Sequence, residues 1–144
     1  MEYGDDDSPF YFPLGLPAFE EEKLFVAITI PDSEPLVFLQ SARTPELCFL
    51  AFPIQAVQPE YHLALSPEDF AVLGGEGELT PRMSADTLVL TLLSVRDGFP
   101  VTANLMAPVI INPRTRRAVQ SVRQDAAYSH QYPISAVSQV ESTC

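Results

Sequence analysis

Apolar side chains recur at alternate positions in short stretches of the first half of the chain. Residues 23–30 place apolar side chains on one face and a mixed set on the other, and the stretch ends at Pro31 and Asp32. This period of two predicts a β-strand. Residues 36–41 and 47–54 predict two more strands, and they are apolar at nearly every position. Strands with two apolar faces belong in a barrel or sandwich whose outer surface is also covered. We therefore expect other segments of the chain to pack against both faces of these two strands.

The second half of the chain predicts a hairpin. Residues 87–95 form a β-rich run, Asp97 and Gly98 are a strong hairpin turn, and residues 101–111 alternate as a second strand. Because Pro108 has no N–H to donate to a neighbouring strand, we expect the second strand to lie at a sheet edge or to carry a bulge there.

One face of the stretch 101–111 is mixed in character, with polar groups beside large apolar ones. The residues on this face are Thr102, Asn104, Met106, Pro108, Ile110 and Asn112. An exposed edge strand presents unpaired backbone groups to which another chain can dock, so this face is a candidate binding surface. After a turn fixed by Pro113, residues 116–124 predict a final strand.

A single short helix is predicted in the middle of the chain. Ser66 suits the N-cap, Pro67 the first helical position, and Asp69 the position three residues after the cap. Gly74 is placed to end the helix in a left-handed conformation. The core-facing residues of this helix would be Phe70 and Leu73.

These patterns predict the fold class and its boundaries. The 14 prolines and six glycines divide the 144 residues into short segments and disfavour long helices. We expect an all-β protein: a small antiparallel β-barrel-like domain with one short helix over residues 1–124. A flexible lead-in over residues 1–8 begins it, and a polar, partly ordered tail over residues 125–144 follows it.

Net charge narrows the class of partner. The chain carries −11, and residues 1–100 hold 17 acidic against four basic side chains. Such a surface repels phosphate backbones, so direct nucleic-acid binding is disfavoured and basic or polar proteins are favoured as partners. The acidic run is Glu20, Glu21 and Glu22, which is either a solvated edge or a contact for a basic partner. The basic cluster is Arg114, Arg116 and Arg117.

Catalytic, metal and membrane signatures are missing from the sequence. His62 and His130 have no partner motif, and there is no Gly-x-Ser-x-Gly elbow, phosphate loop or dinucleotide fingerprint. The two cysteines lack zinc-site spacing. No apolar run approaches the roughly 20 residues of a spanning helix, and the first residues lack the basic start of a secretory signal. We therefore expect a cytoplasmic protein that is not an enzyme and needs no cofactor or metal.

Three blocks of sequence resemble the FliW family. Residues 14–20, Leu-Gly-Leu-Pro-Ala-Phe-Glu, are similar to a Gly-Leu-Pro-Gly-Phe-Glu stretch near the start of that family. Residues 38–41 and 45–49 resemble its second block. Residues 102–113, continuing into 116–120, resemble its longest signature. The blocks occur in the family's order, with one departure: Ala18 stands where the family usually has glycine. If that position needs a positive φ, alanine strains the turn.

The resemblance implies a function as well as a fold. FliW proteins are β-barrel-like flagellar assembly factors with two mutually exclusive partners, flagellin and the RNA-binding translational regulator CsrA. FliW held by unassembled flagellin leaves CsrA free to repress flagellin translation, and FliW released by export binds CsrA and relieves the repression. We expect this chain to do the same without a cofactor and to be monomeric when free.

Two sets of residues are the predicted partner contacts. They are the mixed face of Asn104, Met106, Ile110 and Asn112, and the acidic edge of Glu20, Glu21 and Glu22. For the asparagines and Met106, the alternative is a purely structural role in turns or core. Two other function classes stay open: a nucleic-acid-binding barrel of the OB type, which the small number of basic residues disfavours, and a small hydrolase, for which no nucleophile and base can be named.

Overall fold

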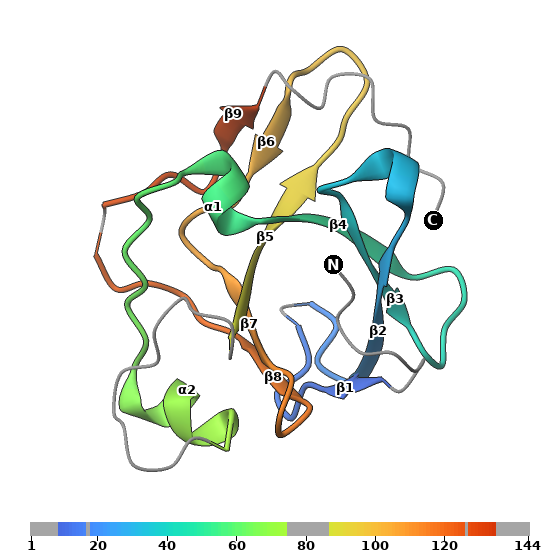
Figure 1. The fold of residues 1–144 in the computed structure, drawn as a ribbon, viewed down its shortest axis with the longest axis vertical. Helices are drawn as coiled ribbons and strands as arrows, with labels where there is room; N and C mark the ends of the chain where they lie inside the picture. Colours follow the sequence, from blue (N-terminus) through green and yellow to red (C-terminus); the bar gives the residue numbers. More distant parts are fainter. Residues whose placement is uncertain (1–8, 17, 75–86, 126, 135–144) are drawn as a thin grey trace.

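Seven strands close into a barrel in the computed structural model, which describes residues 9–16, 18–74, 87–125 and 127–134. Around the ring the order is β4-β3-β2-β1-β8-β7-β5, and pairing of β4 with β5 completes the circle (Figure 1). The barrel strands are β1 (Phe10–Tyr11), β2 (Leu24–Thr29), β3 (Val37–Ser41), β4 (Cys48–Pro53), β5 (Leu88–Ser94), β7 (Val109–Asn112) and β8 (Arg117–Gln120). The predicted all-β, barrel-like fold is confirmed.

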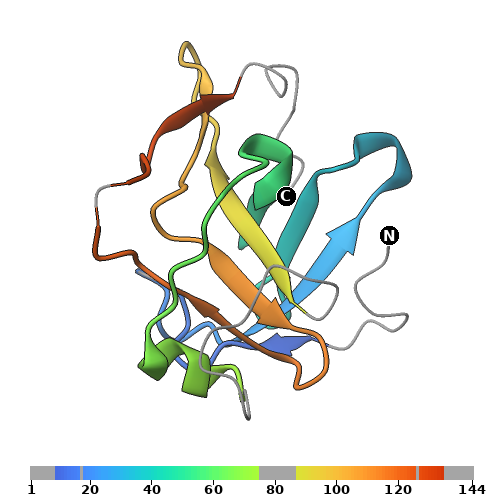
Figure 2. The ribbon, with the colours of Figure 1, turned by 60° about the vertical axis from the view of Figure 1, so that its left-hand side comes forward.

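Nearly all of the strand pairs are antiparallel, as predicted. The exception in the described part of the chain is β1 with β8, which run parallel through the pair Tyr11 and Arg117. Beyond the ring, β6 (Val101–Ala103) pairs with the far end of β5, and β9 (Tyr132–Ile134) pairs with β6. These two strands form a flap beside one end of the barrel (Figure 2).

The barrel interior is filled by one apolar cluster. Phe25, Leu39, Ala51 and Leu90 point inward from four successive neighbours in the sheet order and are fully buried. Phe10 and Phe12 enter from the first strand and the turn after it. Because successive side chains on a strand point to opposite faces, the residues between these positions face outward.

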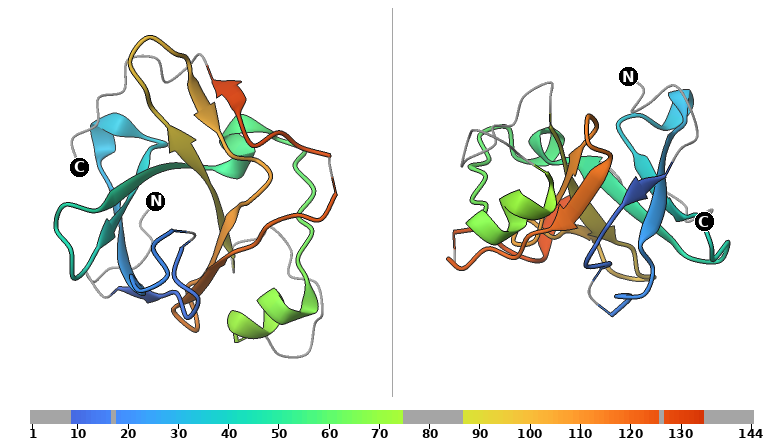
Figure 3. Two further views of the ribbon diagram at one scale, coloured as in Figure 1. Left: turned by 180° about the vertical axis from the view of Figure 1, so that it is seen from behind. Right: turned by 90° about the horizontal axis from the view of Figure 1, so that it is seen from below.

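A second apolar cluster covers part of the outside of the barrel. Val89, Ile110 and Val119 point outward from β5, β7 and β8 and are buried. Ile54 and Leu73 cover them from the segment that carries the helices, and Figure 3 shows this segment lying outside the ring of strands. The covered outer side was expected for residues 36–41 and 47–54, and Phe38, Leu50 and Phe52 of β3 and β4 are buried in this same cluster. That expectation is therefore confirmed for these two strands.

Two short helices, α1 (Ile54–Val57) and α2 (Pro67–Val72), and one 3-10 turn, η1 (Pro31–Ser33), are present in the described residues. The predicted helix is α2: Ser66 caps it by accepting a hydrogen bond from the Asp69 N–H, and Gly74 follows it with a φ of 74°. The second helix, α1, was not predicted, because its four residues continue the apolar run of β4. No helix within the described ranges is long and apolar enough to cross a membrane.

The predicted single strand over residues 101–111 is wrong. The chain forms β6 and β7 instead, joined by a turn at Asn104, whose side-chain oxygen accepts hydrogen bonds from the N–H groups of Met106 and Ala107. Alternation of apolar and polar residues continues through this turn, so the pattern conceals it. The predicted final strand is also shorter, since β8 ends at Gln120.

Part of the predicted tail packs on the domain. In β9, Tyr132 pairs with Ala103 and Ile134 pairs with Val101 of β6, and the Leu105 N–H donates to the Ser129 carbonyl. The predicted lead-in over residues 1–8, residues 75–86, and residues 135–144 of the predicted tail lie outside the described residues.

Candidate partner-binding site

The predicted contact residues fall in separate places. Glu20, Glu21 and Glu22 lie in the loop between β1 and β2, on the side of the molecule away from the β5–β6 hairpin (Figures 1 and 2). Asn104 and Met106 lie in the turn between β6 and β7, and Ile110 and Asn112 lie in β7. The structure therefore does not assemble the two predicted sets into one surface.

The predicted mixed face is wrong for Ile110, which is fully buried in the outer apolar cluster. A residue in that position cannot contact a partner while the fold is intact. Asn112 is half-buried and structural: its amide donates to the Leu73 carbonyl, and its oxygen accepts from the N–H groups of Arg114 and Thr115. Asn112 thus holds the turn after β7 against the end of α2.

Asn104 and Met106 remain partly accessible. The side-chain oxygen of Asn104 holds the turn, and its backbone carbonyl accepts from the Thr91 hydroxyl at 2.8 Å. The Met106 carbonyl accepts from the Arg123 N–H. Both residues therefore have structural roles, and part of each side chain still reaches the surface.

The loop between β1 and β2 is held in place by its backbone. Leu16 and Phe19 exchange two backbone hydrogen bonds, and the Lys23 ammonium donates to the carbonyls of Pro13 and Glu20 at 3.0 and 2.9 Å. Gly15 has a φ of 65°, and a Cβ atom there would lie 2.5 Å from the Glu20 carbonyl oxygen. Only glycine fits this crossing, because the two backbone segments are in direct contact.

Ala18 adopts the conformation that the family glycine suggests. Its φ is 71°, in the left-handed region, and its N–H donates to the Glu20 carboxylate at 3.2 Å. For an L-residue with a Cβ atom this region costs roughly 1–2 kcal/mol. The predicted strain at Ala18 is therefore present.

The three glutamates of the loop differ in their surroundings. Glu20 and Glu21 are exposed, whereas Glu22 is partly buried and turned towards the β3–β4 hairpin. The hydroxyls of Thr44 and Ser41 each donate to the Glu22 carboxylate at 2.8 Å, and these bonds hold its pKa below the ordinary value of 4.5. Glu22 therefore ties the loop to the barrel, and Glu20 and Glu21 are the carboxylates available to a partner.

Two large apolar side chains of the loop are exposed, and the sequence did not single them out. Leu14 is 57% exposed and Phe19 is 39% exposed. The Phe19 ring packs edge-on against Phe49 at 5.6 Å, and Phe49 lies 5.9 Å from Phe25 in the barrel interior. Both residues belong to the first block of the family resemblance, and this membership could have identified them. The alternation of apolar and polar residues could not, because it gives no information about exposure in a turn.

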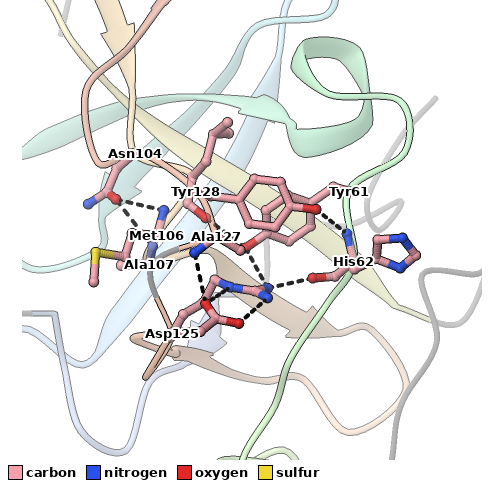
Figure 4. Close-up of polar contacts among 10 residues, drawn as sticks. Tyr61, His62, Asn104, Met106, Ala107, Asp125, Ala127 and Tyr128 are labelled. Atoms are coloured by element: carbon pink, nitrogen blue, oxygen red, sulfur yellow. Dashed lines mark hydrogen bonds and ion pairs between the residues drawn. The ribbon is translucent and has the colours of Figure 1, made fainter.

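A polar cluster joins three distant segments on the flank of the barrel (Figure 4). Arg123 is buried and makes two parallel hydrogen bonds of 2.9 Å to Asp125. The guanidinium also donates to the hydroxyl of Tyr61 and to the backbone carbonyl of His62. It lies 4.8 Å from the centre of the Tyr128 ring. We call these residues the Arg123 cluster.

Two further bonds complete the Arg123 cluster. The Tyr61 hydroxyl donates to the Leu105 carbonyl at 2.7 Å, and the His62 N–H donates to the Tyr128 hydroxyl at 3.0 Å. Hydrogen bonding to Arg123 holds the pKa of Asp125 below its ordinary value, and burial raises the pKa of Tyr61. Every buried polar side-chain atom of the cluster thus has a hydrogen-bond partner inside the protein, which is typical of a cluster that holds segments together.

Backbone docking at a sheet edge is disfavoured on this fold. Every strand of the seven-strand ring has a neighbouring strand on each side, although β1 pairs with only the first two residues of β2. The last strand in the described sheet order is β9, which has three residues, and its middle residue Pro133 has no N–H to donate. The stretch predicted to lie at an edge, residues 101–111, forms β6 and β7, and each of them has a neighbouring strand on both sides.

The two histidines do not converge with other reactive groups. His62 is exposed and contributes only backbone bonds to the Arg123 cluster, and His130 is exposed near β9. Among the described residues, no group of three histidine, cysteine, aspartate or glutamate side chains could hold a metal ion.

Comparisons with known proteins agree on one family. The family model described as FliW protein matches residues 1–134. The chain is 32% identical over 142 residues to the flagellar assembly factor FliW of Syntrophomonas wolfei, which covers 98% of this chain and 86% of the relative. The chain is 35% identical over 118 residues to the flagellar assembly factor FliW of Geobacillus kaustophilus, and this match covers 81% of this chain and 77% of the relative.

A solved structure agrees with the same assignment. A crystal structure described as the flagellar assembly factor FliW superposes with a TM-score of 0.76 at 30% sequence identity, and the match covers 92% of this chain and 89% of that one. Similarity of sequence and of fold therefore point to the same group of proteins.

Proposed function

Because this chain belongs to the FliW family, we propose that it is a flagellar assembly factor that works by binding other proteins. Its partners are flagellin and, alternatively, a translational regulator of the CsrA type. While unassembled flagellin occupies the protein, the regulator is free to repress flagellin translation. Once flagellin is exported, the protein binds the regulator and relieves that repression. The switch works by mass action and takes place in the cytoplasm.

Charge is the observation that carries this proposal. The chain has a net charge of −11, and Glu20 and Glu21 are exposed on a loop of fixed conformation. A regulator that binds RNA must present basic groups, so it meets a surface of complementary charge. The same charge repels RNA itself, which favours a protein partner over the alternative of a nucleic-acid-binding barrel.

The proposed mechanism needs binding alone. The protein is proposed to act as a monomer when free, without catalysis and without a cofactor. Its contact residues are proposed to include Glu20 and Glu21, with Asn104 and Met106 as secondary candidates because part of each reaches the surface. Glu22 and Asn112 are assigned to holding the fold, since their polar side-chain atoms bond within the chain.

Titration calorimetry with purified partners tests the proposal. We expect the full chain to bind flagellin and CsrA separately, each with one-to-one stoichiometry per chain. In the competition arm, saturation with flagellin should abolish the heat of binding to CsrA. A short single-stranded RNA serves as the control and should give no heat at the same concentrations. Absence of binding to both proteins, or binding of both at once, would contradict partner switching.

A further inference from the structure

We infer that one loop surface docks a partner segment that carries an apolar side chain flanked by basic ones. This surface, the loop patch, consists of the exposed residues Leu14, Phe19, Glu20 and Glu21 of the β1–β2 loop. The inference rests on the proposed function and deepens it, because it names the surface and the chemistry of what binds there.

The apolar part of the loop patch is exposed without being loose. Leu14 exposes 57% of its surface and Phe19 exposes 39%. The Phe19 ring is the outermost of a series of packed rings that continues through Phe49 and Phe25 to Phe12 in the barrel interior. An exposed aromatic side chain that is already fixed loses little conformational entropy when a partner covers it.

The backbone beneath the patch is fixed as well. Two hydrogen bonds join Leu16 to Phe19, and Lys23 bridges the carbonyls of Pro13 and Glu20 across the loop. These bonds bring the two sides of the loop together, so that Leu14 and Glu20 are near neighbours although six positions separate them. The patch is therefore preorganised, as the centres of tight interfaces commonly are.

Charge defines the occupant. Glu20 and Glu21 are exposed on the same loop as the two apolar side chains and directly follow Phe19 in the chain, and the ammonium of Lys23 is turned towards backbone carbonyls. A partner segment with lysine or arginine next to an apolar residue would satisfy both parts of the patch. An anionic membrane surface would be repelled by the same carboxylates, which makes a polypeptide the fitting occupant.

The test compares patch variants with matched controls in the calorimetric titrations above. Leu14→Ser and Phe19→Ala each remove an apolar contact, and the double variant Glu20→Gln, Glu21→Gln removes two charges while keeping the side-chain acceptors. Leu14→Ser is the decisive single variant, because Leu14 is the more exposed residue and its loss leaves the packed rings intact.

Controls of the same chemistry lie elsewhere on the surface. Phe99→Ala removes a side chain that is 60% exposed on the β5–β6 hairpin, which lies away from the β1–β2 loop (Figures 1 and 2). The double variant Glu60→Gln, Glu68→Gln changes net charge by the same amount at two exposed acids outside the patch. Thermal unfolding of each variant checks that the fold is retained.

We expect Leu14→Ser and Phe19→Ala to weaken binding of at least one partner by about tenfold or more, as loss of a central contact does. The glutamine double variant should weaken binding less and should flatten its dependence on salt, since charge contributes through screened attraction. The controls should stay within about twofold of the parent chain. If the parent chain binds but the patch variants bind equally well, the loop patch is refuted and the proposed function stands. If the parent chain binds neither partner, both are refuted.

Discussion

The loop patch and the Arg123 cluster use polar groups in opposite ways. In the loop, the backbone and Lys23 form the internal bonds, so Leu14, Phe19, Glu20 and Glu21 are left at the surface. In the cluster, the side chains themselves form the bonds, and Arg123 is buried among its acceptors. A charged side chain is therefore available to a partner where other groups hold its segment in place, as in the loop. It is unavailable where its own hydrogen bonds hold the fold, as in the cluster.

Glu22 shows the same rule within a single run of three glutamates. Its two neighbours are exposed, but its own carboxylate accepts hydrogen bonds from Ser41 and Thr44 and fastens the loop to the β3–β4 hairpin. Glu22 thus has a structural role like that of Arg123, although it belongs to the loop. Substitutions of residues with and without such a role should differ in their effect on the stability of the protein.

The largest expected effect is at the Arg123 cluster. Arg123→Met should lower the free energy of unfolding by about 2–4 kcal/mol, because it leaves the Tyr61 hydroxyl, the His62 carbonyl and Asp125 without their donor. Urea unfolding followed by circular dichroism measures this change. Arg96→Met is the matched control: Arg96 is exposed and stacks on Phe99, and its loss should change stability by less than about 0.5 kcal/mol. Equal effects at the two positions would contradict the structural role of the cluster.

Two substitutions in the loop should act in opposite directions. Gly15→Ala should destabilise the protein by about 2 kcal/mol, because it combines a positive φ with a Cβ atom 2.5 Å from the Glu20 carbonyl oxygen. Ala18→Gly should stabilise it by about 0.5–1 kcal/mol, since glycine relieves the left-handed strain but loses more entropy on folding. Each is the control for the other in the same unfolding experiment. Destabilisation by Ala18→Gly would mean that the strain at this position is negligible.

The smallest expected effect is a change in acid stability from Glu22→Gln. Hydrogen bonds from Thr44 and Ser41 lower the pKa of Glu22 in the folded state, so the folded protein binds the proton less readily than the unfolded chain. The resulting stabilisation is present above the ordinary pKa of 4.5 and is lost as the pH falls through the lower folded value. Glutamine cannot titrate, so the variant should lose less stability than the parent between pH 6 and pH 3. Parallel urea midpoints for the two proteins over this range would contradict the assignment. Glu21→Gln removes a carboxylate from the same run, leaves the hydrogen bonds of Ser41 and Thr44 to Glu22 in place, and is the control variant.

Most of the strands could be predicted, because alternation is a local property. The stretches 23–30, 36–41, 47–54 and 87–95 correspond to β2, β3, β4 and β5. The prediction failed at residues 101–111, where apolar and polar residues continue to alternate through the Asn104 turn. A side-chain cap can terminate a strand without interrupting the pattern on which the prediction depends.

The candidate site was predictable only in part. Glu20 and Glu21 were identified as acidic neighbours, and they are exposed as expected of partner contacts. Ile110 was assigned to a surface, but the outer wall of the barrel is itself covered, and it is buried. The exposure of Leu14 was not predicted, since nothing in its immediate sequence shows what packs over it.

The amino-acid sequence by itself determined the short strands, the α2 cap, the acidic charge and the family resemblance, since each depends on residues close together in the chain or on composition. Only the tertiary structure decided which apolar faces are covered, that Arg123 reaches a tyrosine 62 positions away, and that Leu14 and Phe19 are exposed on one loop with two exposed carboxylates. The reason is physical: hydrogen bonds within a turn depend on neighbouring residues, whereas burial depends on whichever distant segment packs across them.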